Sequence, residues 1–175
     1  MYDFPNLPPE GWLSEAEARL LWETAKATSG AILEVGCYRG RSTVVLASLG
    51  RPVICVDSFA GFNDLDPDGS TTEIVFLETL KERGIKNVTL FRSKVEAWDE
   101  TPHIGKIGFA HLDGDHTASG TRAQILKALA CKVRAIAVHD VNDDGEGVYV
   151  KRACMEVLGQ WDERVERLAV WRNLC

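Results

Sequence analysis

The stretch AILEVGCYRGRSTVVLASLG, residues 31–50, decides the fold that this sequence predicts. Its first part, residues 31–36, is a short apolar run stopped by a glycine, which is typical of a strand buried on both faces. Residues 41–50 have the apolar spacing of a helix, and Gly36 and Gly40 allow the sharp turn that joins the two. A buried strand, a glycine turn and a helix in this order indicate an α/β protein.

The same alternation of strands and helices continues on both sides of this stretch. Further buried strands are expected at residues 52–57, 87–92, 106–113 and 134–140, and helices at 14–30, 70–84, 119–131 and 146–161. This order predicts a doubly wound, Rossmann-like sheet of about seven strands, mostly parallel and covered by helices on each side. Residues 163–174 form one strand or a tight hairpin, which closes the sheet with an antiparallel element.

The length of the chain and the positions of its prolines predict one folded unit with a short arm. Three of the six prolines fall in residues 1–13, which we expect to be an extended arm. Ser14 and Glu17 then form a capping box at the start of the first helix. Residues 14–175 are long enough for one domain with its own core.

Composition excludes several classes of function. The formal charge of −6 and the pI of about 5.3 argue against a nucleic-acid groove, which needs clustered Lys and Arg. The five cysteines show no C-x-x-C spacing, so reduced thiols are expected rather than disulfides or a zinc ribbon. No signal-peptide pattern and no apolar run long enough for a membrane span is present. We expect a soluble, cytoplasmic protein.

Polar residues gather where the predicted strands end. In a parallel α/β sheet, ligands bind outside the carboxyl ends of the strands. Those ends are Gly36, Asp57, Arg92, Asp113 and Asp140, so three of the five strands stop on an aspartate. Carboxylates gathered along one rim repel each other unless positive charge lies among them. The rim is therefore the predicted functional site.

The turn at residues 34–42 and Asp57 can each be interpreted either as part of a ligand site or as an ordinary structural feature. Gly36 would let the backbone approach a ligand closely, and Gly40 would ease entry into the helix, whose free N–H groups attract an anion. The glycines are four residues apart, so this is not the dinucleotide motif G-x-G-x-x-G, and a generic glycine turn is the alternative. Asp57 follows Gly36 by 21 residues, where an acidic group commonly binds ribose hydroxyls; the alternative is a simple turn aspartate.

Taken in order, five motifs resemble a known family. GWLSEAEARLLWETA, ILEVGCYRGRSTVVLA, VICVDSFAGF, FAHLDGDHT and AIAVHDV are similar in sequence and spacing to class I S-adenosylmethionine-dependent methyltransferases. The closer likeness is to small O-methyltransferases of the catechol and macrolide-sugar type, and it extends over about residues 10–171. The resemblance implies transfer of a methyl group from S-adenosylmethionine to a hydroxyl of a small molecule.

The resemblance also implies which residues bind the cofactor. Glu34, Gly36 and Tyr38 would lie along its methionine part, with Gly40 at the helix entry and Ser42 bonded to its carboxylate. Asp57 would hold the ribose hydroxyls, Ser58, Phe59 and Ser93 would lie near the adenine, and Asp113 would also serve the cofactor. These pairings are electrostatically sensible, because an anionic group meets helix N–H groups and acidic side chains meet an ammonium and hydroxyls.

For catalysis, the resemblance points to three residues. Asp113 and Asp140 align with carboxylates that bind Mg²⁺ in the catechol-type enzymes, and His116 aligns with the side chain that takes the acceptor proton. A histidine has a suitable unperturbed pKa near 6.5. The family places an amide directly after its second aspartate, where this chain has Val141. Two alternatives follow: a shifted loop supplies the third ligand from residues 142–144, or the site holds no metal.

Neighbouring residues and rival functions stay open at this point. Asp115 is expected to be a solvated turn residue and His139 a near-core histidine. D-x-D-x-T at Asp113 also resembles haloacid-dehalogenase-type phosphatases, with Asp113 as nucleophile and Asp115 as general acid. His111, Asp113 and His139 match an iron facial triad in residue type, although the alternating fold argues against it. A non-catalytic, cofactor-binding partner module is a further alternative.

The acceptor is the least determined part of the prediction. Walls for it are expected from Phe4 and Trp12 in the arm and from the loops at residues 60–69 and 141–147. Their acidic character favours a polar or cationic acceptor, or a sugar, over a flat aromatic one. Because few segments are available to cover the sheet, we expect an open site or a lid supplied by a second copy in a homodimer.

Overall fold

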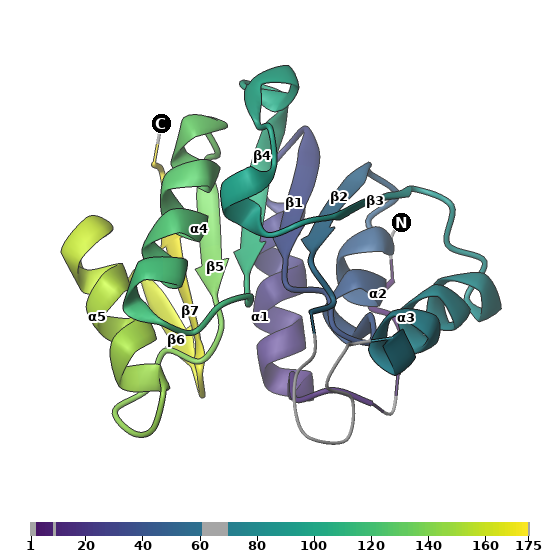
Figure 1. Ribbon diagram of the computed structural model, residues 1–175, viewed down its shortest axis with the longest axis horizontal. Helices are drawn as coiled ribbons and strands as arrows, with labels where there is room; N and C mark the ends of the chain where they lie inside the picture. The colour runs from purple at the N-terminus through teal and green to yellow at the C-terminus, as the bar shows by residue number, and fades with distance from the viewer. Residues whose placement is uncertain (1–2, 9, 61–69, 175) are drawn as a thin grey trace.

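The computed structural model describes residues 3–8, 10–60 and 70–174, and its centre is one seven-stranded sheet (Figure 1). The strand order is β3-β2-β1-β4-β5-β7-β6. The strands are β1 Ala31–Val35, β2 Val53–Asp57, β3 Val88–Arg92, β4 Ile107–Leu112, β5 Ala135–Val138, β6 Glu163–Val165 and β7 Leu168–Arg172. The pairings from β3 through β5 are parallel, whereas β7 is antiparallel to both β5 and β6. The predicted doubly wound fold with an antiparallel end is confirmed.

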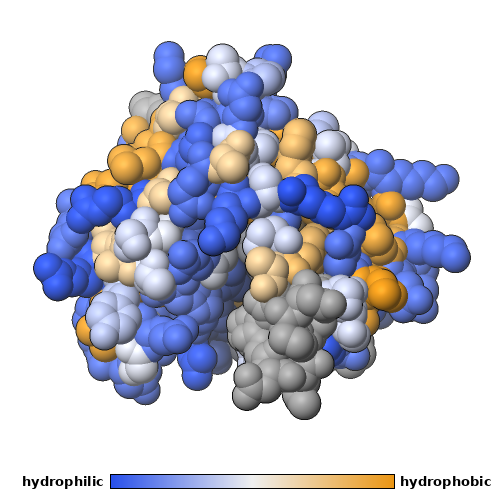
Figure 2. All heavy atoms as spheres, in the orientation of Figure 1, coloured by the Kyte–Doolittle hydropathy of each residue, from blue (hydrophilic) through white to orange (hydrophobic). Residues whose placement is uncertain are grey.

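Helices cover both faces of the sheet. One side carries α1 Glu15–Lys26, α2 Arg41–Ala47 and α3 Ser70–Glu82, and the other carries α4 Ala118–Ala130 and α5 Gly147–Val157 (Figure 1). Two short 3₁₀ helices, η1 Val95–Ala97 and η2 Thr101–His103, follow β3. Ile32 and Leu33 are adjacent and both fully buried, and they belong to the two different cores, because successive strand residues point to opposite faces. The outer surface in Figure 2 is mostly hydrophilic.

Local interactions explain where α1 begins and where α5 ends. At the start of α1, the Ser14 hydroxyl accepts from Glu17 N and the Glu17 carboxylate accepts from Ser14 N, so the predicted capping box is confirmed. The helix predicted at 146–161 is shorter than expected: it ends at Val157, and Gly159 follows with φ of 75°. A glycine in this conformation ends a helix rather than continuing it. The C-terminal segment is a hairpin, with Glu166 in its turn.

The N-terminal arm packs against the helices α1 and α2. Phe4 packs edge-on against Trp22 with ring centroids 6.1 Å apart, and Arg41 Nε donates to the Leu13 carbonyl at 2.6 Å. These contacts bring Trp12 to the carboxyl ends of the strands. In the part of the chain that the structure describes, no helix is both long and apolar enough to span a membrane.

The site is positioned by the place where the strand order changes direction. β1 lies between β2 and β4, so the chain leaves it toward one side first and returns to its other side later. Ligands of such sheets bind in the crevice at this point. A Cβ built on Gly36, which has φ of 83°, would lie only 2.1 Å from the Asp113 carbonyl oxygen. Gly36 is required here because no side chain fits between the two strand ends.

Candidate functional site

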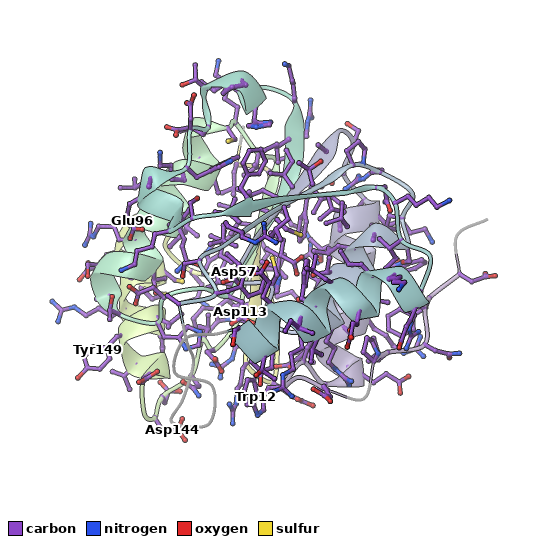
Figure 3. All side chains as sticks on the ribbon, turned by 45° about the vertical axis from the view of Figure 1, so that its right-hand side comes forward. Trp12, Asp57, Glu96, Asp113, Asp144 and Tyr149 are labelled. Atoms are coloured by element: carbon purple, nitrogen blue, oxygen red, sulfur yellow. The ribbon has the colours of Figure 1, made fainter. Side chains whose placement is uncertain are left out.

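A cavity of about 620 Å³ opens at the carboxyl ends of β1, β2, β4 and β5. Ten of the predicted site residues line it: Gly36, Tyr38, Ser42, Asp57, Ser58, Phe59, Ser93, Asp113, His116 and Asp140. In Figure 3, Asp57 and Asp113 lie near the centre of the molecule, with Trp12 and Asp144 below them. Residues far apart in the sequence therefore meet in one ligand-sized space.

The half of the cavity beneath β1 and β2, here the turn half, is organised by Asp57. Its Oδ2 accepts from Cys37 N at 2.7 Å and Tyr38 N at 3.1 Å, and its Oδ1 accepts from Phe59 N at 2.8 Å. Tyr38 and Phe59 have φ of 47° and 45°, a conformation that these bonds help to hold. A carboxylate has about four acceptor sites, so Asp57 retains capacity for a hydroxyl of a ligand.

Glu34 and Gly40 were predicted at the site, and the structure places both behind the cavity wall. Glu34 is fully buried, and its Oε2 accepts from Thr43 Oγ1 at 2.7 Å. Gly40 begins α2 with φ of 88°, and a Cβ there would meet Phe76 at 3.3 Å. The expectation that the Glu34 carboxylate lies along a ligand is corrected: strand alternation points it to the face under α2, away from the cavity.

The half of the cavity beyond β4 and β5, here the charged half, joins five ionisable side chains. Asp113 Oδ1 lies 3.4 Å from His116 Nε2 and 3.4 Å from His139 Nδ1. Asp140 Oδ2 lies 3.7 Å from the Nδ1 atoms of both histidines. Glu146 Oε2, at the start of α5, is also 3.7 Å from His116 Nδ1. Two imidazoles thus supply the positive charge that the carboxylates need.

The pKa shifts in this half follow from these contacts. The hydrogen bond to Asp113 raises the pKa of His116 above its ordinary value, against the opposing effect of burial. For His139, burial favours the neutral form, but the charge of Asp113 and the contacts with Asp113, Asp140 and Glu17 outweigh it and raise the pKa. Burial would raise the pKa of Asp113, yet both histidines together lower it. Ionised aspartates therefore face charged or readily charged imidazoles.

Two members of the charged half were not identified from the sequence. Glu17 of α1 places Oε2 at 3.4 Å from His139 Nε2, and its Oε1 accepts from Arg167 N at 2.9 Å. Arg167, in the β6–β7 turn, reaches Asp140 Oδ1 with Nη1 at 3.4 Å. The sequence signal for Glu17 was its capping box, which gives no hint of a contact 150 residues away. His139 is buried, as expected, but it belongs to the site.

The tightest group of donor atoms in the charged half is not the all-oxygen set that Mg²⁺ prefers. Oxygen or nitrogen atoms of Asp113, His139 and Asp140 lie within 4.8 Å of one another. Mg²⁺ prefers an all-oxygen, octahedral shell, whereas this set includes an imidazole, and both carboxylates already face cations. Val141 is fully buried in the core, so it is not a ligand. Asn142 lines the cavity, and its buried Oδ1 has no hydrogen-bond partner among the described residues. Asn142 is therefore the residue that would supply the third oxygen in the shifted-loop alternative.

The structure also places the residues of the rival interpretations. Asp115 is exposed, and its Oδ1 accepts from Thr117 N at 2.8 Å, so it is the solvated turn residue that was expected. His111 is fully buried and does not line the cavity. Among the described residues, it does not share a three-donor group with Asp113 and His139. The facial triad is therefore not assembled.

Two of the expected acceptor walls can be placed. Trp12 is 61% exposed at the cavity rim, and its ring centroid lies 5.0 Å from that of Tyr38. Asn142, Asp144 and Glu146 line the cavity from the loop before α5. Phe4 packs on Trp22 instead of the cavity. Of the loop at 60–69, residues 61–69 lie outside the described residues.

Comparisons with known proteins agree with this fold. A family model for a methyltransferase domain matches residues 33–141. Rv0187 from MTB, a cofactor-bound structure, aligns with a TM-score of 0.67 and 18% identity over 96% of this chain and 84% of that chain. CalS11, a calicheamicin methyltransferase, gives 0.64 and 18% over 91% and 80%. The SAH-bound methyltransferase PaMTH1 of Podospora anserina gives 0.65 and 14% over 91% and 78%.

No curated protein sequence matches the chain, and structural likeness at these identities establishes the fold alone. The family model, however, covers more than half of the chain, and it includes both the Gly36 turn and the ends of β4 and β5. The chain therefore belongs to the methyltransferase domain family, and its fold is the Rossmann-like fold of the methyltransferase structures named above.

Proposed function

We propose that this protein transfers a methyl group from S-adenosylmethionine to a hydroxyl of a small polar acceptor, with His116 as general base. The observation that carries the proposal is the shared cavity: the Asp57 turn and His116 line the same 620 Å³ space. A cofactor held in the turn half would present its methyl group toward the charged half. The acceptor hydroxyl would then lie between that methyl group and His116.

His116 is held in the orientation that a base needs. Asp113 Oδ1 faces Nε2 at 3.4 Å, and Asp140 Oδ2 and Glu146 Oε2 lie 3.7 Å from Nδ1. In our proposal the Nε2 proton is directed to Asp113, and Nδ1 accepts from an acceptor hydroxyl that enters between these two carboxylates. S-adenosylmethionine supplies an activated methyl group on a sulfonium. As the oxygen–methyl bond forms and the sulfur–methyl bond breaks, the hydroxyl proton passes to His116 Nδ1. Positioning and deprotonation are the main work that such a transfer requires.

The charged half carries out this chemistry without a divalent metal in our proposal. His139 and Arg167 neutralise Asp113 and Asp140, which removes the need for a cation between the two carboxylates. The protonated product of the base, His116 imidazolium, is stabilised by Asp113, Asp140 and Glu146. We therefore expect activity to be unchanged, within about twofold, when a chelator such as EDTA is added or Mg²⁺ is supplied.

The lining of the charged half favours a sugar-like or cationic acceptor. Trp12 offers an exposed ring face at the rim, which suits the apolar face of a sugar or a cation. Asp144 and Glu146 offer acceptors for hydroxyl or ammonium groups. CalS11, one of the structural neighbours, is described as a TDP-rhamnose 3'-O-methyltransferase. Its substrate class is a suitable first panel for this protein.

Calorimetric titration with S-adenosylhomocysteine tests the cofactor part of the proposal. Micromolar, one-to-one binding by the wild type is expected, with no dependence on Mg²⁺. Methyl transfer is then measured as release of S-adenosylhomocysteine from S-adenosylmethionine across a panel of nucleotide sugars, amino sugars and catechols. Absence of binding by the folded wild type would overturn the proposal. Binding without turnover in any His116-dependent reaction would leave the non-catalytic module as the better account.

A further inference from the structure

A second polar group of side chains lies behind the cavity wall and has no role in the proposed reaction. Glu34, Cys55 and His111 lie side by side on β1, β2 and β4, because Glu34 pairs in register with Cys55 on one side and His111 on the other. Cys37 follows β1 and is 1% exposed, and the other three are fully buried. These four residues are called the thiol cluster below.

The polar atoms of the thiol cluster are only partly satisfied. Glu34 Oε2 accepts from Thr43 Oγ1 at 2.7 Å and from Cys55 Sγ at 3.3 Å. Glu34 Oε1 and both ring nitrogens of His111 have no hydrogen-bond partner within the described parts of the chain. The nearest approach between them is 3.6 Å, from His111 Nδ1 to Glu34 Oε1. Such orphaned buried groups are rare in native proteins, and an ordered water or an ion is the usual explanation.

The donor atoms favour a particular kind of ion. Donor atoms of Glu34, Cys37 and Cys55 all lie within 4.8 Å of one another, and the imidazole of His111 adjoins the carboxylate. Two thiols, a carboxylate and an imidazole are the ligand types of tetrahedral zinc sites, in which zinc–sulfur bonds of about 2.3 Å put the sulfurs roughly 3.8 Å apart. The donors of Glu34, Cys37 and Cys55 therefore need only a small contraction to bind one zinc ion, and His111, which is not in this group, would have to move toward it from its place beside Glu34. The sulfur donors disfavour Mg²⁺ and Ca²⁺.

We propose that Cys37, Cys55 and Glu34, with His111 Nδ1 as the fourth donor, bind one thiophilic divalent cation such as Zn²⁺. Two sulfur–metal bonds replace two sulfur–hydrogen bonds, and the two protons are released to solvent. The unpaired Glu34 Oε1 and His111 Nδ1 both gain a partner in the same event. No redox change takes place.

The thiol cluster is suited to a structural ion rather than to chemistry on a substrate. Burial raises the pKa of the Cys37 thiol well above its ordinary value, and the neighbouring carboxylates add to this effect. The thiols are therefore neutral and unreactive unless a cation compensates their charge. Cys37 N also donates to Asp57 Oδ2 at 2.7 Å, so an ion bound to Cys37 would brace the turn that organises the turn half of the cavity.

Titration with Co²⁺ tests this proposal directly, because cobalt reports its ligands. The reduced, metal-free protein is expected to bind one equivalent, with thiolate-to-cobalt charge-transfer absorption and tetrahedral d–d bands, and Zn²⁺ should abolish both. The other three-donor group, Asp113, His139 and Asp140, has no sulfur. Cobalt bound there cannot give a charge-transfer band of this kind, so the two sites are distinguished by one spectrum.

Variants of the five cysteines provide the matched controls. Replacing Cys131, Cys154 and Cys175 together by alanine leaves only the thiols of the cluster, and the charge-transfer band should persist. Cys37→Ser, at the cavity wall, should weaken Co²⁺ binding more than 100-fold, and Cys55→Ser should do the same. Cys37→Ser and the wild-type spectrum decide the question if Cys55→Ser does not fold.

The outcome is independent of the proposed methyl transfer. Wild-type protein that binds S-adenosylhomocysteine but shows no charge-transfer band with Co²⁺ would overturn the zinc site alone. A band that survives in Cys37→Ser would overturn it as well, since its sulfur ligands would then lie elsewhere. A band in a protein that does not bind S-adenosylhomocysteine would support the metal site while removing the proposed function.

Discussion

In the turn half of the cavity, three backbone N–H groups from two short turns converge on one carboxylate, that of Asp57. In the charged half, side chains from α1, from the ends of β4 and β5 and from the β6–β7 turn form one ion network. The histidines and Arg167 contact Asp113 or Asp140, and Glu17 contacts His139. The first half is mainly backbone, so many side chains could change without altering it. The second is an ion network, in which each member depends on the charge of the next.

This difference predicts how a substitution in each half affects binding, catalysis and stability. Losing a backbone-organising carboxylate should weaken cofactor binding and leave the charged residues in place. Losing one member of the ion network should leave a buried charge without its partner, which strongly affects catalysis or stability.

The largest effect is expected for His116→Gln, which keeps a polar side chain of similar length but cannot accept a proton at neutral pH. Removal of a general base typically reduces turnover about 10³-fold, or about 4 kcal/mol. The affinity for S-adenosylhomocysteine should stay within about twofold, because His116 lies in the charged half. Steady-state kinetics and calorimetry measure the two quantities. Equal losses in both would show that the halves are not separable.

The pH dependence of the wild type sharpens the same prediction. His116 must be unprotonated to act as a base, and Asp113 raises its pKa. Activity should therefore fall as the pH drops through that raised value. In Asp113→Asn the main cause of the shift is gone, so the acidic limb of the kcat profile should move to lower pH. A limb that stays in place would contradict the role of His116.

Glu17→Gln is expected to have the largest effect on stability. It leaves His139 without its buried partner and weakens the contact with Arg167, which should lower the free energy of unfolding by about 3 kcal/mol at pH 7. Glu15→Gln is the matched control, because Glu15 is exposed on the same helix turn. Urea unfolding of both variants measures the difference, and equal midpoints would contradict a network role for Glu17.

The sign of the pH effect on Glu17 follows from its lowered pKa. Burial would raise the pKa, but contacts with His139, Ser14 and Arg167 lower it from 4.5 to about 2. A carboxylate with a lowered folded-state pKa stabilises above its unfolded pKa, and this stabilisation is lost as the pH falls toward the folded value. The stability gap between the wild type and Glu17→Gln should therefore narrow between pH 4.5 and pH 2.

Asp57→Ala should weaken S-adenosylhomocysteine binding by about 30- to 100-fold, because hydrogen bonds to a charged group contribute about 1.5–3 kcal/mol each. Asp57→Asn retains one acceptor oxygen and should lie between the wild type and the alanine variant. The pKa seen in the acidic limb of the kcat profile should be unchanged in both. A shift of that limb would mean that the turn half reaches into the ion network.

The smallest effect is expected for Trp12→Ala, which removes an exposed ring at the rim. The KM for a sugar-like acceptor should rise about tenfold, in line with the contribution of one stacked aromatic contact. The affinity for S-adenosylhomocysteine should be unchanged. If Trp12→Ala instead affects only that affinity, the rim belongs to the turn half, and the acceptor lies deeper in the cavity.

The parts of the molecule that follow from short stretches of sequence could be predicted. The strand at Ala31–Val35, the Gly36 turn and the position of Asp57 all lie in one local strand–helix–strand pattern, and the capping box at Ser14 needs only four residues. The alternation of strands and helices along the chain is enough to place these elements in a parallel sheet. The same reasoning brings Asp113 and Asp140 to the rim, because both follow parallel strands.

What could not be predicted depends on long-range contacts. The motif around Glu34 predicts a ligand-binding residue, but the pleat of β1 points its side chain away from the cavity. Glu17, His139 and Arg167 meet only after α1 has packed on one face of the sheet and β7 of the C-terminal hairpin has paired with β5. A single sequence gives no signal for such a meeting, because each residue has an ordinary local explanation.

The contact between Glu17 and Arg167 also sets an order of events during protein synthesis. A ribosome releases the whole of β1 to β3 before it has made β4, so the turn half can form early. The charged half must wait until residue 167 has emerged, because only then can the β6–β7 turn reach back to α1. Until that moment a nascent chain can contain the turn half without the complete ion network, so the charged half is the last part of the cavity to be completed.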